Sequence, residues 1–345
     1  MADALVIRLA REELVYLLRA LRIPAIATLE PGPLITLEGD QLALALAVAD
    51  RTLRARGMLH RGSAEQRQPD PVVVGLLRGL GQPRYTLMLD VRRSPESTKA
   101  GSATSGQTEE KPLAQRLIYS FASYAAIEQT QPEPGIHQFV ALATPQDAFL
   151  RLHELIEVAD ADGSGGTQTP NAGAANGARG QLPQGEIGSD LLGEVNRLLA
   201  AGNTSGAQQA LTKEVSPTLA QGLIAALASP RSFAQFALWP GLPLTMSAPA
   251  GQGPGTTNTG QLIPREPTAT LIVAQGQEGA IYTLTQGDPS APASGAAGER
   301  SRSGAHQTRI KVEQVTADQA RAAMARILRP ALDTLTTQSQ ASAPQ

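Results

Sequence analysis

The chain has 345 residues, with 29 basic and 31 acidic side chains, and its formal net charge is −2. This near-neutral balance gives no electrostatic case for binding nucleic acid or an acidic membrane surface. The chain contains no cysteine, which excludes disulfides, thiolate metal sites and a cysteine nucleophile. The sequence shows neither the pattern of a signal peptide nor an uncharged apolar run of about 18 residues. We therefore expect a cytoplasmic protein without membrane insertion.

Hydrophobic spacing in residues 1–158 predicts helices alternating with strands. The predicted elements, in chain order, are a strand at 4–9, a helix at 11–21, a strand at 34–37, helices at 40–56 and 72–80, strands at 85–91, 117–124 and 136–142, and a helix at 145–156. The last of these helices begins with Thr144 as a capping residue and Pro145 in its first turn. Residues 92–111 are rich in Ser, Thr, Gly and Glu, and predict a disordered insertion.

Residues 159–185 are rich in Gly, Asn and Gln, and predict a flexible linker between two halves of the chain. The second half, residues 186–335, has predicted helices at 187–199, 204–215 and 218–228, strands at 233–238, 268–274, 280–285 and 309–315, and a closing helix from Thr316. Residues 247–266 and 286–307 predict two further insertions, and residues 336–345 a disordered tail.

A helix–proline–strand unit occurs twice. In the segments 75–91 and 222–238, the residues at five equivalent positions match without a gap: Gly75 and Gly222, Leu76 and Leu223, Leu80 and Leu227, Pro83 and Pro230, Arg84 and Arg231. Internal similarity of this kind predicts an α+β fold with two pseudo-twofold-related halves, each with antiparallel strands packed against helices. The alternative is two unrelated α+β segments whose shared Gly and Pro merely mark turns.

Motifs that would support catalysis or cofactor binding are missing from the sequence. The run from His153 to Glu157 resembles the start of a zincin helix, but Glu157 stands where the second histidine is required. His137 lies in a predicted strand, without an identifiable partner for general-base chemistry. Glycine-rich tracts lack the residues of a phosphate-binding loop, and no nucleophile elbow occurs. We expect a protein that is not an enzyme, with no metal, no cofactor and no catalytic residue.

Four aromatic residues are candidates for contact with a partner protein. Tyr119, Phe121 and Tyr124 lie within six residues of one another, directly after the predicted insertion that ends at Lys111. Trp239, the only tryptophan, stands at the corresponding place in the second half. Such residues serve either in core packing or in a sheet surface that receives a helical partner. The second interpretation places the contact region at these four residues and at residues 92–111.

The layout resembles the EspG family, the cytoplasmic chaperones associated with ESX or type VII secretion. The resemblance rests on the strand and helix from Leu5 to Leu21, the Arg56-Gly57 helix end, the helix–proline–strand unit from Leu76 to Val91, and the closing hairpin, strand and helix from Thr268 to Leu328. It implies a quasi-twofold α+β fold and a non-enzymatic role, holding the apolar tip of a helical PE/PPE- or WXG-like substrate until export.

Two other classes of protein stay open from the sequence alone. One is an enzyme of unknown type with a site between the two halves. The other is a structural or regulatory interaction protein that has no link to secretion.

Overall fold

The computed structural model describes residues 5–27, 39–61, 67–94, 113–155, 182–246, 262–287 and 308–339. Its centre is a 10-stranded sheet in the order β1-β7-β6-β5-β4-β9-β12-β13-β14-β8, in which every neighbouring pair is antiparallel. Two short hairpin-like sheets pair β2 with β3 and β10 with β11. The strands are β1 (Leu5–Ala10), β2 (Leu59–Arg61), β3 (Arg67–Pro69), β4 (Tyr85–Arg93), β5 (Leu113–Phe121), β6 (Ala126–Glu133), β7 (Ile136–Leu142), β8 (Gln184–Gly188), β9 (Ser232–Pro240), β10 (Leu244–Met246), β11 (Leu262–Pro264), β12 (Ala269–Gln275), β13 (Ile281–Gly287) and β14 (Arg309–Val315).

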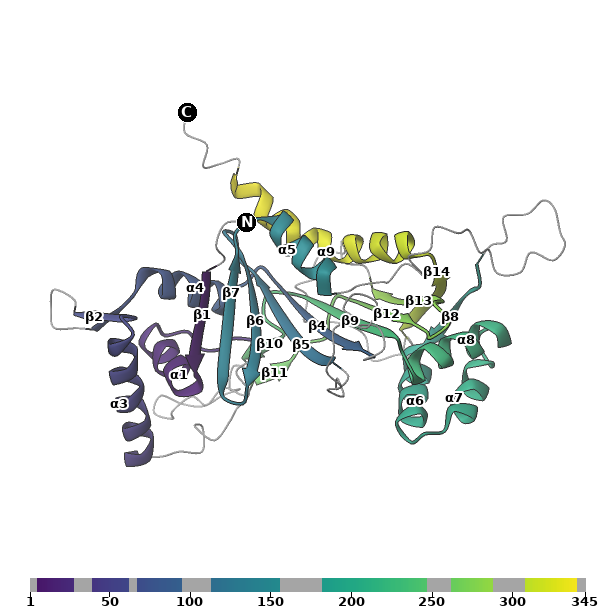
Figure 1. Cartoon of the computed structure of the whole chain (residues 1–345), viewed down its shortest axis with the longest axis horizontal. Coiled ribbons are helices and arrows are strands. Elements are labelled where there is room, and N and C mark those ends of the chain that lie inside the picture. The colour runs from purple at the N-terminus through teal and green to yellow at the C-terminus, as the bar shows by residue number, and fades with distance from the viewer. Residues whose placement is uncertain are drawn as a thin grey trace, which may run out of the picture.

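Helices cover both faces of the large sheet. They are α1 (Arg11–Ala20), α3 (Gly39–Ala55), α4 (Pro71–Gly81), α5 (Pro145–Leu155), α6 (Ser189–Ala200), α7 (Thr204–Leu211), α8 (Pro217–Ala228) and α9 (Ala317–Ser339). Figure 1 shows α5 and α9 lying along one side of the sheet, where Leu152, Met324 and Leu328 pack on the central strands. On the other side, α1, α3 and α4 pack against β1, β6 and β7. There α6, α7 and α8 pack against β8, β12, β13 and β14.

The repeated helix–proline–strand units are built alike. Asp70 caps α4 by accepting a hydrogen bond from the Val72 N–H at 2.8 Å, and Ser216 caps α8 by accepting one from the Leu219 N–H at 3.4 Å. Both helices begin with a proline, which suits the first turn because its missing N–H has no helical partner there. Both end shortly before the next proline, and a strand of 9 residues follows in each case.

These two strands, β4 and β9, are neighbours at the middle of the sheet. They pair over their whole length, from Tyr85 opposite Pro240 to Arg93 opposite Ser232. At the midpoint of the pairing, Leu89 lies opposite Phe236, and both side chains are completely buried beneath α9. On one side of this joint, the five strands that end with β4 all come from residues 5–142. On the other side, the five strands that begin with β9 all come from residues 184–315.

The structure confirms a mixed fold with a large antiparallel sheet. It also adds strands that the sequence did not predict. β6 follows β5, so three strands follow β4 just as three strands of the large sheet follow β9. At residues 184–188 the structure has β8, where the sequence predicted the end of a linker and the start of a helix. The register of β8 with β14 places Ile187 opposite Ile310, and both are buried.

The predicted flexible segments fall mainly outside the described residues, as does the predicted strand at 34–37. Regular structure enters three of these segments. β4 continues to Arg93, at the start of the predicted insertion 92–111, and β11 lies within the predicted insertion 247–266. Helix α9 extends to Ser339, within the predicted tail 336–345. The domain limits and the disorder of these segments stay predictions.

Gly222 of the repeat is required by close packing. A Cβ built on Gly222 in α8 would lie 1.9 Å from the hydroxyl oxygen of Tyr282 in β13. At Gly75, the equivalent position in α4, a Cβ would have no other atom within 4 Å. A side chain at residue 222 would therefore require Tyr282 to shift.

We expect Gly222→Ala to lower the free energy of unfolding by about 1–3 kcal/mol, because overpacking forces Tyr282 to move. Gly75→Ala is the matched control and should raise that free energy by about 0.5–1 kcal/mol, since alanine favours the helix more than glycine does. Urea denaturation of the two variants measures both changes. Equal effects at the two positions would contradict this packing argument.

Candidate functional site

Helix α3 is fixed to the protein through its second half. Asp50 is buried, accepts a hydrogen bond from the Tyr16 hydroxyl of α1 at 2.9 Å, and pairs with Arg54 at 3.0 Å. It also forms an ion pair with Arg67 of β3. The buried carboxylate therefore joins three elements, and burial without such partners would be costly.

A second buried carboxylate, Glu13 of α1, acts just beyond the C-terminal end of α3. Glu13 pairs with Arg56 at 2.6 Å and accepts a hydrogen bond from the Ala10 N–H at 2.9 Å. The Arg56 guanidinium also donates to the Arg8 carbonyl oxygen. These contacts fix the C-terminal end of α3 against β1 and α1.

The first half of α3 presents an apolar surface. The run from Leu42 to Val48 consists only of Leu, Ala and Val, yet none of its side chains is buried. Leu44 is 68% exposed and Val48 is 52% exposed. Figure 1 shows α3 extending away from the large sheet at one end of the molecule. A helix that is apolar around most of its circumference is normally buried, so this surface is unusual for an isolated chain.

A groove of about 500 Å³ runs along this surface between α3 and the start of α1. Leu44, Ala45, Val48 and Ala49 of α3 line it, together with Ala10 and the polar residues Glu12, Glu13, Gln41 and Thr52. An exposed apolar surface beside polar side chains is typical of a protein-binding site. We call this groove and the exposed residues of α3 the α3 surface.

The four aromatic residues predicted to contact a partner lie apart from the α3 surface. Tyr119 and Phe121 are completely buried beneath α5 and α9, and Trp239 is mostly buried, with its indole N–H donating to the Arg265 carbonyl at 2.9 Å. Tyr124 is 52% exposed, and its hydroxyl donates to the Gly75 carbonyl of α4. Tyr119 and Phe121 are close neighbours, whereas Trp239 is not grouped with them in the core.

A polar cluster is buried in the first half of the sheet. The Tyr119 hydroxyl donates to Glu128 at 2.7 Å, and Arg151 of α5 pairs with the same carboxylate at 3.1 Å. Burial raises the pKa of Tyr119, and the Glu128 carboxylate raises it further. On the next strand position, the Gln129 amide lies 3.4 Å from His137 Nδ1. Burial, with Arg11 nearby, lowers the pKa of His137.

The titratable groups described here do not assemble a metal site: within the described ranges, no three His, Asp or Glu side chains gather as ligands. His153 lies on α5, and its predicted companion Glu157 is outside the described residues. His137 contacts an amide and stacks near Phe139, with ring centroids 6.4 Å apart. In the parts of the chain that the structure describes, every helix is too short or too polar to cross a bilayer.

Sequence reasoning missed the α3 surface. The spacing of Leu42, Leu46, Ala49 and Leu53 predicts one packed face of this helix, and of these residues Ala49 and Leu53 are buried. The signal that could have revealed the surface is Leu44 and Val48, which place apolar side chains on another face of the same helix.

The fold and the α3 surface together describe an α+β protein with an exposed apolar surface on one helix. No protein-family model matches the chain, and no curated protein matches it. The structure is similar to that of the Mycobacterium tuberculosis type VII secretion system chaperone EspG5, solved in complex with the PE25-PPE41 dimer. The TM-score is 0.49 at 10% sequence identity, and the match covers 96% of this chain and 97% of that chain.

His137 should make stability depend on pH. Its pKa is lowered in the folded protein, so below about pH 6.5 the unfolded chain takes up a proton that the folded chain resists. The stability that depends on a neutral His137 is fully present above about pH 6.5. It is lost as the pH falls from about 6.5 toward the lowered pKa. The slope from this one group is at most about 1.4 kcal/mol per pH unit.

We expect His137→Gln to reduce the loss of stability between pH 7.5 and pH 5, compared with the unaltered protein. Urea denaturation at several pH values measures this difference. His153→Gln, at a partly exposed site on α5, is the matched comparison. If both histidine variants kept the profile of the unaltered protein, His137 would not be the group responsible.

Proposed function

We propose that this chain is a non-enzymatic binding protein, a cytoplasmic chaperone or adaptor that holds an apolar helical segment of a secretion substrate. The observation that carries the proposal is the α3 surface: an apolar helical run left exposed, beside an apolar groove, on a firmly anchored helix. The sequence resemblance to the EspG family supports the choice of partner, a PE/PPE- or WXG-like protein of a type VII-like system.

The energetics of the α3 surface favour a helical partner. Burying a Leu or Val side chain that was exposed contributes about 1.5–3 kcal/mol, so Leu44 and Val48 together supply a substantial part of a micromolar affinity. An amphipathic helix places apolar side chains at intervals that fit a groove beside another helix. The buried carboxylates Asp50 and Glu13 hold α3 in place before a partner binds.

We also propose that the chain arose by internal duplication and that its halves are related by a pseudo-twofold axis. A shift of 147 positions, from Gly75 to Gly222, also carries β4 (Tyr85–Arg93) onto β9 (Ser232–Pro240). The same shift relates Leu89 to Phe236, which face each other at the middle of the pairing. The residues that are equivalent in the repeat are thus also the residues that pair at the middle of β4 and β9. This agreement supports a twofold axis that passes between Leu89 and Phe236.

Of the four aromatic candidates, Tyr124 has an accessible side chain. Tyr119, Phe121 and Trp239 are packed inside the protein in this structure, so the proposal of direct contact is restricted to Tyr124. We keep the predicted contact of residues 92–111 with the partner as part of the proposal, although residues 95–111 lie outside the described residues.

The proposal predicts that a double variant, Leu44→Gln with Val48→Gln, binds substrate at least about tenfold more weakly. The measurement is calorimetric titration with purified helical PE/PPE- or WXG-type proteins of the native host. Stability should change little, because both side chains are largely exposed in the free protein.

Leu150→Gln is the matched control, since Leu150 is an exposed leucine on α5, far from this groove in the fold. It should bind as the unaltered protein does. The proposed role of the α3 surface fails if the double variant binds normally, or if Leu150→Gln weakens binding to the same degree.

A further inference from the structure

The exposed side of α3 carries apolar and charged side chains in one stripe. Its members are Asp40, Leu44, Val48 and Arg51, all exposed, at successive spacings of four, four and three residues. Such spacings keep side chains on one side of a helix, because a helical turn has about 3.6 residues. From the start of α3 toward its end, the stripe therefore reads acid, leucine, valine and base.

The centre of the stripe is an accessible apolar patch. Leu44 is the most exposed of the large hydrophobic residues that the structure describes, and Val48 follows one turn later. Ala47 lies between them and is exposed as well. Because the distance between two packed helices depends on the size of the side chains at the contact, an alanine here lets a second helix approach closely.

The charges at the two ends of the stripe are available to a partner. The side chains of Asp40 and Arg51 are exposed and form no hydrogen bond or ion pair with any residue that the structure describes. The neighbouring Arg54 differs, since it pairs with the buried Asp50 at 3.0 Å. The stripe thus has one unpaired acid at its start and one unpaired base at its end, within the described chain.

The order of these four residues is self-complementary. When a second α3 lies antiparallel beside the first, with the centre of the contact near Leu46, Leu44 of one copy faces Val48 of the other. The same arrangement brings Asp40 of each copy to within about one residue of Arg51 of the other, as twofold symmetry requires. The acid and the base lie about 16 Å apart at about 1.5 Å per residue, so a parallel arrangement would oppose like charges at both ends.

The position of α3 in the fold suits contact with a second molecule. Figure 1 shows the helix at one end of the molecule, extending away from the large sheet. In the second half, α7 follows α6 and precedes α8 just as α3 lies between α1 and α4. Helix α7 has 8 residues and no charged side chain. The equivalent helix of the second half therefore has no such stripe.

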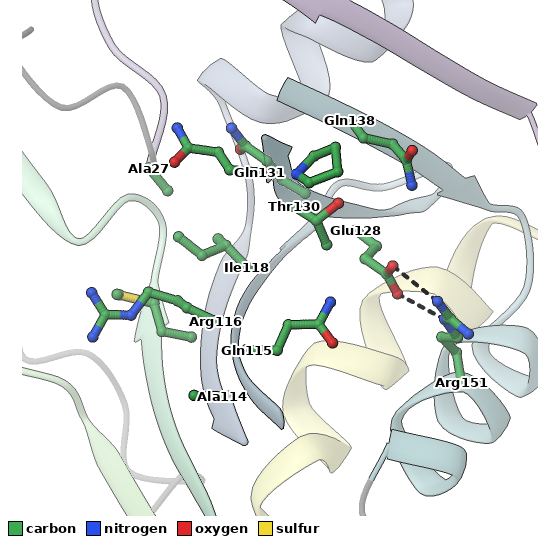
Figure 2. A pocket seen from close by; sticks show the side chains of 13 residues that line it. Ala27, Ala114, Gln115, Arg116, Ile118, Glu128, Thr130, Gln131, Gln138 and Arg151 are labelled. Atoms are coloured by element: carbon green, nitrogen blue, oxygen red, sulfur yellow. Dashed lines mark hydrogen bonds and ion pairs between the residues drawn. The ribbon is translucent and has the colours of Figure 1, made fainter. Parts of the chain in front are cut away.

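Another cavity, beside β5 and β6, does not suit a helix. It has a volume of about 450 Å³, and Arg151 pairs there with Glu128 at 3.1 Å (Figure 2). Amides and charged groups, such as Gln115, Gln131 and Arg116, make up much of its lining. Because burial of apolar surface drives most association in water, the α3 surface is the better place for a helix to pack.

We propose that a second copy of this chain covers the α3 surface, in a twofold dimer whose two α3 helices pack antiparallel. Leu44 and Val48 of each copy exclude water from the centre of the contact, and the pairs of Asp40 with Arg51 at its two ends fix the register. A contact formed mainly by two helices is small compared with the interfaces of permanent dimers, so the dimer dissociates on dilution.

The dimer goes beyond the proposed function, but it uses the same surface. Dimer formation and substrate binding exclude each other, because both bury Leu44 and Val48. This exclusion rests on the proposed function, whereas the dimer itself does not. In the absence of substrate, the second copy keeps the apolar side chains of α3 out of water, and a substrate of higher affinity replaces it.

Sedimentation velocity at low salt, over about a hundredfold range of protein concentration, measures the dimer. We expect the unaltered protein to change from monomer to dimer as the concentration rises. Asp40→Arg and Arg51→Asp should each raise the dissociation constant at least about tenfold, because each change opposes like charges twice in the dimer. Leu44→Gln with Val48→Gln should weaken the dimer at least as much.

Mixing the two charge variants is the sharpest comparison. In a mixed dimer of Asp40→Arg with Arg51→Asp, every cation of one copy faces a carboxylate of the other, so an equimolar mixture should dimerise as the unaltered protein does. Asp190→Arg is the matched control, because Asp190 is also an exposed aspartate in the first turn of a helix, α6, and lies outside the α3 surface. It should dimerise normally. Circular dichroism verifies that the variants fold.

The inference is overturned if the unaltered protein stays monomeric over this range, if the mixture does not recover the dimer, or if Asp190→Arg weakens the dimer to the same degree. A monomeric protein whose Leu44→Gln and Val48→Gln variant loses substrate would contradict the dimer and leave the proposed function in place. A dimer that responds to the charge exchange as expected, with normal substrate binding by that double variant, would support the dimer and contradict the proposed function.

Discussion

The antiparallel joint between β4 and β9 is the interaction on which the rest of the structure depends. Nine paired positions connect the first and second parts of the chain into one sheet. Leu89 and Phe236 lie at its midpoint and are buried beneath α9. Because α9 belongs to the second part of the sequence and also packs on β5, its burial couples the two parts further. Separating them would expose both a strand edge and this apolar core.

The two halves have the same strand order, so their elements can be compared place by place. In the second half α7 is a short helix packed through Ala207, Ala210 and Leu211, and β12 and β13 are fully paired. In the first half α3 has 17 residues and exposes its apolar start, and β5 diverges from β6. The exposed apolar surface of α3 therefore lies in the first half.

The long helices and the central strands could be predicted because their patterns are strong and local. β6 was missed because only Ala126 and Ile127 are apolar, and β8 because Ile187 is its one large apolar residue. β8 owes its place to β14, which is distant in sequence, whereas β6 pairs with its neighbours in sequence, β5 and β7. The sequence also could not show that α5 and α9 would cover Tyr119 and Phe121. The exposure of Leu44 depends on how the rest of the described chain packs around α3, which no local pattern reveals.

The central claim is that the first half of this protein receives the partner. Hydrogen exchange across the chain, with and without a saturating helical substrate, tests it most directly. We expect slower exchange in the first half of α3, with α6, α7 and α8 unchanged. Protection confined to α6, α7 and α8, or to the outer side of α9, would contradict it.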